Sequence, residues 1–482
     1  MTKFSKSDES ASSFDSDFSS AIFRFSRSLT DLREFSELVE SLIKKHKLKE
    51  LETALSRYDG LGEALCQLDD TLKSDIHLIQ DACAENQTPC ESSLRFEVKD
   101  NGNGKVHLSA FGHRDDLKDF DKTISTILRS ESGVQHLHRS SLISLVSVVE
   151  SFLSRLLHLF FRKHPSAVNA KEKQFTFEEL SAFSSLEDAR TYLVSWKIEN
   201  LLRGSYDDWV EYFRSQLKLE LPGINKHHDQ LVENFQRRNL FVHNDGVVNK
   251  IYLSKVSKSL TKPDMLDKSL SVSRTYLFSA IDCFESAFLQ LAFELWAKCE
   301  KKSDERPSLI VHSSYDALQN KRWNVATEIA EFIVRDKAAD EISILMAKVN
   351  AWIARKRVGG LDAIKVEVTD FDVSAKDDLF RLARHCLLDE HDAALTLIMR
   401  LYKGKRFSLS ELSDWPLFED LRSNSDMKSW LTQLREKAAS AKKKAAPTNG
   451  KESSTNEPAE SKTSTARRPR VKKKPLPTVE SV

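Results

Sequence analysis

Apolar residues recur every three or four positions along most of this chain, the spacing that places them on one face of an α-helix. Near the N-terminus two such series follow each other across the polar stretch KKHK: Leu32, Phe35, Val39 and Leu42, then Leu48, Leu51 and Leu55. A second amphipathic stretch, GEALCQLDDTLKSDIHLIQDA, comes next. We therefore predict a helical hairpin that packs on its neighbours within residues 21–130. A coiled-coil dimer is the alternative, which the short and interrupted repeat disfavours.

A β-hairpin is predicted near residues 94–111, where apolar and polar residues alternate as they do in a half-buried strand. The two alternating stretches are LRFEV and KVHLSAF, and KDNGNG between them contains the Asn-Gly steps that suit a tight turn. Because two strands alone are only marginally stable, we expect the hairpin to decorate a helical body.

Residues 137–299 contain five helical stretches that we predict to form a compact antiparallel bundle. One face of the first stretch is traced by apolar residues up to the helix-ending sequence HPS: Leu142, Leu145, Val149, Phe152, Leu156 and Phe160. The fourth stretch is HDQLVENFQRRNLFVH, and the long fifth ends at WAKC. The apolar run 141–161 has the length of a membrane span, but Glu150, Arg155 and His158 make insertion too costly. We therefore expect a buried helix and no membrane association.

The remaining segments flank this bundle. Beyond Pro307, shorter helix pairs with small residues at their crossings loosely resemble a tetratricopeptide array over residues 307–435, although no repeat of fixed period is present. Residues 1–20 are rich in Ser and Asp, and residues 436–482 are basic and low in complexity, so both ends are predicted to be disordered. The expected fold is therefore all-α, with one small hairpin.

Composition favours the same fold class. The chain of 482 residues has 40% apolar and 30% charged residues, and only 13 Gly and 11 Pro, which argues against a loop-rich β architecture. Its six cysteines lack a CxxC pair, and the N-terminus has no secretory pattern. We therefore expect a cytoplasmic protein without disulfides, metal or any other cofactor. His227-His228 and His385-Cys386 lack second ligand pairs at useful spacing and are expected to be surface or packing residues.

Charge is distributed unevenly, although the net charge is only +1. Residues 441–482 hold eleven Lys and Arg against four Glu, so the first 440 residues carry a net charge of about −6. Any affinity for nucleic acid must therefore come from a local patch or from the tail. We interpret the basic run RRPRVKKKP as a flexible tether that adds salt-sensitive RNA affinity, with a nuclear address or solubilising charge as alternatives.

The stretch QRRNLFVHNDG, residues 236–246, carries the strongest candidate chemistry. Arg238 and His243 are five residues apart, about 140° around a regular helix, so an unbroken helix sends them to different faces. The stop signal NDG that follows lets His243 lie in a frayed last turn and swing back toward Arg238. The C-terminal end of the helix dipole also favours positive groups at this position.

This stretch resembles the R-x4-6-H motif of the HEPN superfamily, the nucleotide-binding domains of higher eukaryotes and prokaryotes. RNLFVH fits the motif, Asn239 is the polar residue that usually follows the arginine, and the neighbouring SLVSVVESFLSRLLHLFF and NDGVVNKIYL look like bacterial members associated with RNA cleavage. The resemblance covers residues 137–299 and implies a homodimer in which both Arg-His sets face one groove. It further implies a metal-independent endoribonuclease, as in toxin–antitoxin, phage defence or stress systems.

The resemblance also assigns roles to the motif residues. His243 would be the general base or acid for the ribose 2′-OH and the leaving oxygen. Arg238 would hold the scissile phosphate and its developing charge, and Asn239 would orient the histidine or the phosphate. The RNA itself supplies the attacking group, so the products would be a 2′,3′-cyclic phosphate and a 5′-hydroxyl.

Arg237, Asn244 and Glu150 are candidate supporting residues of this site. Glu150 is a carboxylate in the middle of an apolar helix, and this position makes it a candidate residue of the site. A buried carboxylate that is satisfied by Arg155 or by a backbone group is the structural alternative.

The motif itself also has a structural alternative. Arg238 and His243 would then only cap the helix and pair with carboxylates such as Glu233 or Asp245. Some members of the superfamily keep the bundle without catalysis. The competing hypothesis is therefore a non-catalytic adaptor, in which the bundle dimerises and the C-terminal array recruits a protein partner.

Overall fold

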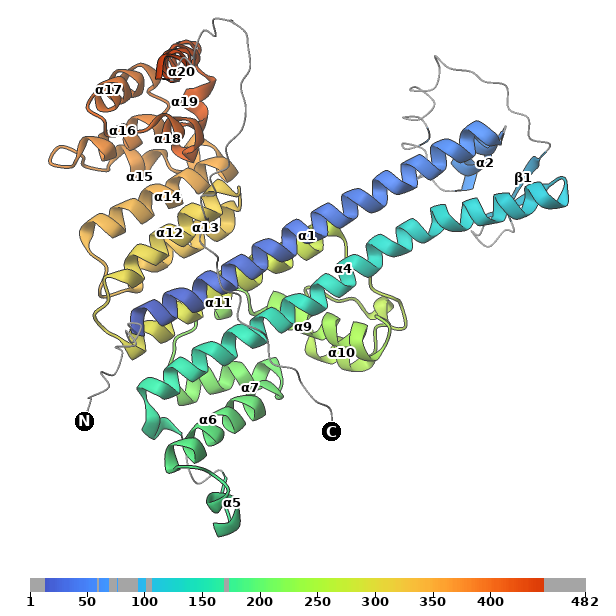
Figure 1. Cartoon of the computed structure of the whole chain (residues 1–482), viewed down its shortest axis with the longest axis horizontal. Helices are drawn as coiled ribbons and strands as arrows, with labels where there is room; N and C mark the ends of the chain where they lie inside the picture. The colour runs from blue at the N-terminus through green and yellow to red at the C-terminus, as the bar shows by residue number, and fades with distance from the viewer. Residues whose placement is uncertain are drawn as a thin grey trace, which may run out of the picture. The chain divides into compact units, whose positions relative to one another are not determined.

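The fold consists of α-helices and one two-stranded antiparallel sheet in the described part of the chain, as the sequence predicted (Figure 1). The computed structural model describes residues 14–58, 60–68, 76, 94–100, 106–168 and 173–445. Residues up to Asn424 form one compact unit, and residues from Ser425 onward form a second. Of the two predicted disordered ends, residues 1–13 and 446–482 lie outside the described ranges.

The first unit contains an N-terminal and central set of elements: α1 (Phe14–Arg57), α2 (Leu61–Leu68), β1 (Arg95–Asp100), β2 (Val106–Phe111), α4 (Arg114–Lys163), α5 (Phe177–Ser181), α6 (Leu186–Leu202), α7 (Tyr206–Glu211), α8 (Pro222–Lys226), α9 (His228–His243), α10 (Lys250–Lys255) and α11 (Arg274–Cys299). Its C-terminal set is α12 (Glu305–Gln319), α13 (Trp323–Phe332), α14 (Glu341–Gly359), α15 (Lys365–Thr369), α16 (Asp378–Leu387), α17 (His391–Lys403), α18 (Leu409–Asp414) and α19 (Glu419–Ser423). The second unit has α20 (Ser425–Ala445) as its described helix. This helix runs past residue 436, where disorder was predicted to begin, because Ala and Lys in KAASAKKKA are good helix formers.

α1 and α4 lie side by side in antiparallel directions (Figure 1). Phe25 of α1 stacks on Phe152 of α4, with ring centroids 4.1 Å apart, and both side chains are buried. The two long helices correct two predicted boundaries. Residues 14–20, which were assigned to a disordered end, are the first turns of α1, and the boundary expected between residues 130 and 137 lies inside α4.

Long-range packing explains both corrections. Phe18 stacks on Trp296 of α11 at 5.4 Å between ring centroids, and Asp15 accepts a hydrogen bond from the indole of Trp296 at 2.8 Å. These contacts order a segment whose composition alone predicted disorder. In α4, the stretch SESGVQHL contains Gly133 but no proline, and a single glycine costs only about 1 kcal/mol in a helix.

Polar side chains lie at the centre of the α1–α4 interface, where the sequence predicted an apolar face. Ser36 and Glu40 of α1 are buried, whereas Phe35 and Leu42 are 56% and 57% exposed. The Ser36 hydroxyl lies 2.9 Å from the hydroxyl of Ser141 in α4. Phe35 and Leu42 of the predicted stripe were therefore wrong as buried positions, whereas Leu51 of the same stripe is buried. Hydrogen bonding makes the burial of serine acceptable at the positions that do face inward.

β1 and β2 form the predicted hairpin, with Arg95 opposite Phe111 and Asp100 opposite Val106. The hairpin packs on a small core made by the end of α1, α2 and the start of α4. The buried residues of this core are Leu51, Ala54, Tyr58, Leu61, Leu65, Ile76, Leu94, Phe120 and Ile127. The hairpin therefore decorates a helical body, as expected. The predicted turn residues 101–105 lie outside the described ranges.

α11 is the central helix of the bundle and contacts α1, α4, α8, α9 and α13. By length and composition alone, α11 and the Gly133–Lys163 part of α4 are apolar enough to cross a membrane. However, 78% of the apolar window of α11 and 44% of that of α4 are buried inside the protein. Both helices therefore provide packing surfaces of the bundle, in line with the buried helix predicted over residues 141–161.

The C-terminal set consists of helices in pairwise contact. α12, α13 and α14 pack on one another, and α16 packs on α17. Their lengths of 15, 10 and 19 residues for α12, α13 and α14 fit no repeat of fixed period. Since α13 contacts α11 and α12 contacts α1, this set belongs to the same compact unit as the bundle and is not a separate domain.

Candidate functional site

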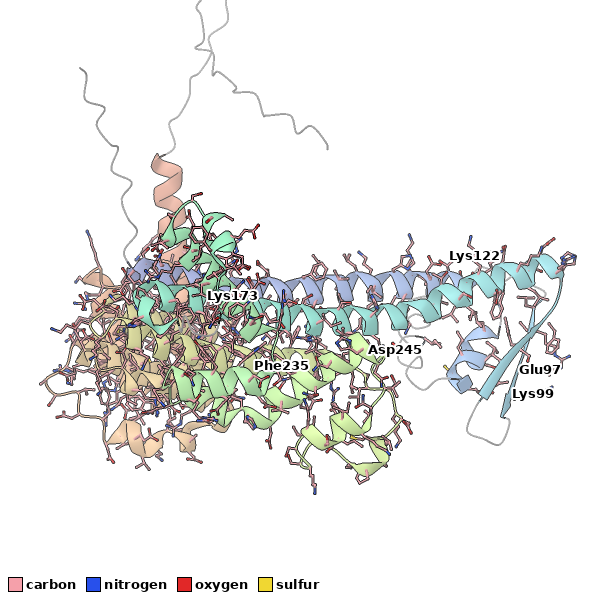
Figure 2. All side chains as sticks on the ribbon, turned by 90° about the horizontal axis from the view of Figure 1, so that it is seen from below. Glu97, Lys99, Lys122, Lys173, Phe235 and Asp245 are labelled. Carbon is pink, nitrogen blue, oxygen red and sulfur yellow. The ribbon has the colours of Figure 1, made fainter. Side chains whose placement is uncertain are left out.

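α9 carries the Arg-His motif and contacts α4, α10 and α11. Its buried apolar residues include Leu231, Phe235 and Leu240, as the sequence predicted. Phe235 packs on Phe284 of α11 with ring centroids 5.3 Å apart. Figure 2 labels Phe235 within this helix and Asp245 in the turn that follows it. This packing fixes the rotation of α9 and so determines the direction of each motif side chain.

α9 ends sharply at His243. The backbone N–H of Gly246 donates to the carbonyl of Leu240 at 3.0 Å, which closes the last turn. Asp245 and Gly246 have φ values of 47° and 77°, and a Cβ on Gly246 would lie 2.7 Å from the ring of Phe241. Glycine is therefore needed at this position. NDG is the predicted stop, but the last turn is closed and not frayed, which corrects the expectation that His243 swings back toward Arg238.

Arg238 and Glu150 are brought together by α9 and α4. The Arg238 Nη2 donates to the Glu150 Oε1 at 2.8 Å, with side chains that are 23% and 34% exposed. The buried Nε of Arg238 has no hydrogen-bond partner in the described part of the chain. Glu150 is therefore satisfied by Arg238 and not by Arg155, the partner considered from sequence. The carboxylate holds the guanidinium at one edge and leaves part of it in contact with solvent.

The carboxylates suggested as partners of Arg238 bind other arginines. Glu233 accepts from Arg237 at 2.6 Å. Asp245 lies 3.5 Å from a guanidinium nitrogen of Arg139 on α4. Arg238 therefore pairs with a carboxylate, as the structural alternative expected, but the partner is Glu150 and not Glu233 or Asp245.

Arg237 lies in a buried polar network and not at the candidate site. Besides its bond to Glu233, its Nη1 donates to the Ser271 carbonyl at 2.8 Å, and its guanidinium lies 4.1 Å from the centre of the Tyr276 ring. The hydroxyls of Tyr252 and Tyr276 also donate to Glu233. Burial, and then the charge of Glu233, raises the pKa of both phenols well above the ordinary value. Arg237 therefore ties α9 to α10 and α11, and its candidate supporting role at the site stays a prediction.

His243 and Asn239 occupy another side of α9. His243 is exposed and is about 140° from Arg238 around the helix, whereas Asn239 is only about 40° from His243. Within one chain, α9 does not bring the imidazole to the Arg238–Glu150 pair. Asn244 donates from Nδ2 to the Val247 carbonyl at 2.6 Å and so stabilises the turn. Of the predicted set, Arg238 and Glu150 therefore meet, and Asn239 and His243 share a second side of the helix.

A cavity of about 480 Å³ lies among α9, α11 and α13, and the sequence did not indicate it. Its lining includes charged and polar side chains of the three helices and of His227, which immediately precedes α9: Gln230, Arg274, Asp282, Asn324 and Glu328. His227 Nε2 lies 2.6 Å from a Glu328 oxygen. Burial raises the pKa of Asp282, which accepts from Arg33 of α1 at 2.6 Å. The residues come from separate helices, so no local motif signals them.

Two of the histidines considered as metal ligands from the sequence, His227 and His385, lie beside carboxylates of the chain. His227 pairs with Glu328, and His385 Nδ1 lies 2.5 Å from Glu390. The described residues contain no group of three or more His, Cys, Asp and Glu side chains arranged to hold a metal ion. His385 and His227 therefore each have a carboxylate partner within the chain.

No protein-family model, curated protein or solved structure matches this chain. The HEPN resemblance therefore depends on the motif and its helical setting. The structure adds two facts to that setting: a partly exposed arginine held by a carboxylate, and an exposed imidazole at the end of the same helix.

Proposed function

We propose that this chain is a metal-independent endoribonuclease of the HEPN type that acts as a homodimer. The observation that carries the proposal is the Arg238–Glu150 pair, which fixes a partly exposed guanidinium on the helix that ends with the exposed His243. These are the two groups that cleavage by the ribose 2′-OH requires, a fixed cation and a proton-transferring imidazole. The resemblance further suggests a cytoplasmic enzyme of bacterial defence or stress response.

The reaction needs no group outside the protein and the RNA. His243 removes the proton of the 2′-OH, and the 2′-oxygen attacks the adjacent phosphorus. The new 2′-O–P bond forms as the P–O5′ bond breaks, and the 5′-oxygen leaves with the proton that the His243 imidazolium has taken from the 2′-OH. Arg238 stabilises the charge that develops on the phosphoryl oxygens, while Asn239 orients the imidazole or the phosphate.

A dimer solves a geometric problem of the single chain. Arg238 and His243 point to sides of α9 that differ by about 140°, so one chain does not direct both at one phosphate. In a two-fold dimer, Arg238 of one protomer and the partner's His243 can face the same phosphodiester. Each dimer then holds two equivalent composite sites.

The decisive experiment is cleavage of total RNA by the purified chain in EDTA, followed by analysis of the RNA ends. We expect 2′,3′-cyclic phosphate and 5′-hydroxyl ends from the wild type and at least about 100-fold slower cleavage by Arg238→Ala and His243→Ala. His312→Ala removes an exposed histidine of α12 and is the matched control that should retain activity. Cleavage that persists in both motif variants would refute the proposal.

A non-catalytic adaptor is the second candidate, and the separation of Arg238 from His243 around α9 favours it. In this alternative the bundle dimerises and the C-terminal set of helices recruits a protein partner. RNA that stays intact beside a stable dimer in the same experiment would support the adaptor over the nuclease.

A further inference from the structure

A lysine-rich segment follows the motif helix directly. Residues 249–268, here called the lysine segment, hold five lysines and two aspartates, a local net charge of +3. The first 440 residues as a whole carry a net charge of about −6. The lysine segment is therefore a positively charged stretch in a part of the chain with negative net charge. Affinity for a polyanion requires such a local positive patch.

The lysines are free to meet a ligand. All five are exposed: Lys250, Lys255, Lys258, Lys262 and Lys268. Lys268 lies 3.0 Å from Asp264, whereas none of the other four forms an ion pair with a described residue. Four ammonium groups outside any such ion pair therefore face solvent on one short segment.

A small core holds the lysine segment on the end of α9. Val248, Tyr252 and Val256 are buried together with Leu240 of α9. The hydroxyl of Tyr252 also donates to Glu233 of α9 at 2.8 Å. The segment therefore cannot move independently of the motif helix, although it lacks long secondary structure.

Backbone hydrogen bonds close the segment at its base. Val248 donates to the Lys268 carbonyl at 2.9 Å, and Leu270 donates to the Gly246 carbonyl at 2.9 Å. Val247, at this base, is four residues after His243. The Cα atoms of the two residues are therefore no more than about 14 Å apart. The base of the lysine segment is therefore held close to the candidate proton-transferring group.

We propose that the lysine segment binds the phosphate backbone of single-stranded RNA that flanks the cleaved bond. This inference rests on the proposed function for the identity of its ligand. Lysine ammonium groups are point charges that bind phosphates without reading bases, so the segment supplies affinity and register and no sequence preference. Substrate positioning in this protein then has a separate anchor beside the cleaving groups.

The test measures binding of the full-length chain to a short RNA that carries 2′-O-methyl groups on every ribose and so cannot be cleaved. Fluorescence anisotropy is recorded over a series of salt concentrations. The variant replaces Lys250, Lys255, Lys258 and Lys262 with Gln, and we expect about 10-fold weaker binding or more at low salt. The slope of log affinity against log salt should fall by about 0.7 for each phosphate that the variant no longer neutralises.

The matched control removes the same charge elsewhere. It replaces four exposed lysines of the C-terminal helices and their connecting turns with Gln: Lys337, Lys365, Lys403 and Lys405. We expect the control to bind RNA like the wild type. Equal losses in the two variants, or a salt slope that the first variant leaves unchanged, would overturn the proposal. The same holds if the first variant loses binding to vesicles of anionic lipid but not to RNA.

Cleavage assays separate this inference from the proposed function. On cleavable RNA, the lysine-segment variant should have a raised KM and an unchanged kcat. A wild type that binds RNA through these lysines but leaves cleavable RNA intact refutes the nuclease and retains the RNA surface. Normal cleavage with unchanged affinity in the variant refutes the surface and retains the nuclease.

Discussion

The guanidinium of Arg238 and the carboxylate of Glu150 form an ion pair between α9 and α4, with 2.8 Å between Nη2 and Oε1. Both side chains are partly exposed, and such pairs contribute only about 0–1 kcal/mol. A phosphate oxygen can therefore engage the guanidinium without a large penalty. The pair is better suited to orient Arg238 than to stabilise the fold.

This relationship predicts different results for two substitutions of Glu150. Glu150→Ala removes the acceptor that orients Arg238, and we expect RNA cleavage to slow by about 10-fold. Glu150→Gln retains an acceptor oxygen at the same place, so it should keep most of the activity. The measurement is kcat on a short RNA in EDTA. Equal losses for the two variants would show that Glu150 acts through its charge and not as a positioning residue.

The angle between Arg238 and His243 predicts complementation between inactive variants. Mixed dimers of Arg238→Ala and His243→Ala contain one intact composite site if the two groups come from different protomers. After unfolding and refolding of an equal mixture, we expect about a quarter of the wild-type activity. Each variant refolded alone is the control and should remain inactive. A mixture as inactive as its components would show that each site is built within one chain, or that there is none.

The local pattern of α9 predicted its buried side, its end and its stop, because these depend on residues a few positions apart. Leu231 and Phe235 are buried, and NDG ends the helix at His243. The partner of Glu150 was not predictable in this way. It depends on how α9 is rotated against a helix more than eighty residues earlier, whereas the sequence pointed only to Arg155 or a backbone group as partners.

The first half of α1 shows the opposite error, in which a clear pattern predicted the wrong face. Phe35 and Leu42 lie on the predicted apolar stripe but are exposed, while Ser36 and Glu40 face α4. Polar residues at these inward positions find partners across the interface, such as Ser141. Hydrophobic periodicity alone assigns Ser36 and Glu40 to the surface, because it contains no information on hydrogen bonds between helices.

The position of α1 in the core predicts a contrast between two phenylalanines of that helix. Phe25 is 3% exposed and stacks on Phe152, whereas Phe23 is 61% exposed. Phe25→Ala should lower the free energy of unfolding by about 3–5 kcal/mol, the usual cost of emptying a buried aromatic site. Phe23→Ala should change it by no more than about 0.5 kcal/mol. Chemical denaturation measures both, and similar effects would mean that α1 does not pack on α4 as described.

Glu328 predicts a pH-dependent contribution to stability. Burial acts to raise the pKa of its carboxyl group, but hydrogen bonds from His227 and Lys226 outweigh burial and lower the pKa below the ordinary value. A lowered pKa in the folded state stabilises the protein above the unfolded pKa of about 4.3, and this contribution is lost as the pH falls through the folded pKa. The free energy of unfolding of the wild type should therefore exceed that of Glu328→Gln at pH 7, and the difference should shrink below pH 4. Glu34→Gln, which changes an exposed carboxylate, should show no such trend. A difference that stays constant down to pH 3 would contradict the assignment, because the ionised carboxylate would then contribute nothing beyond its shape.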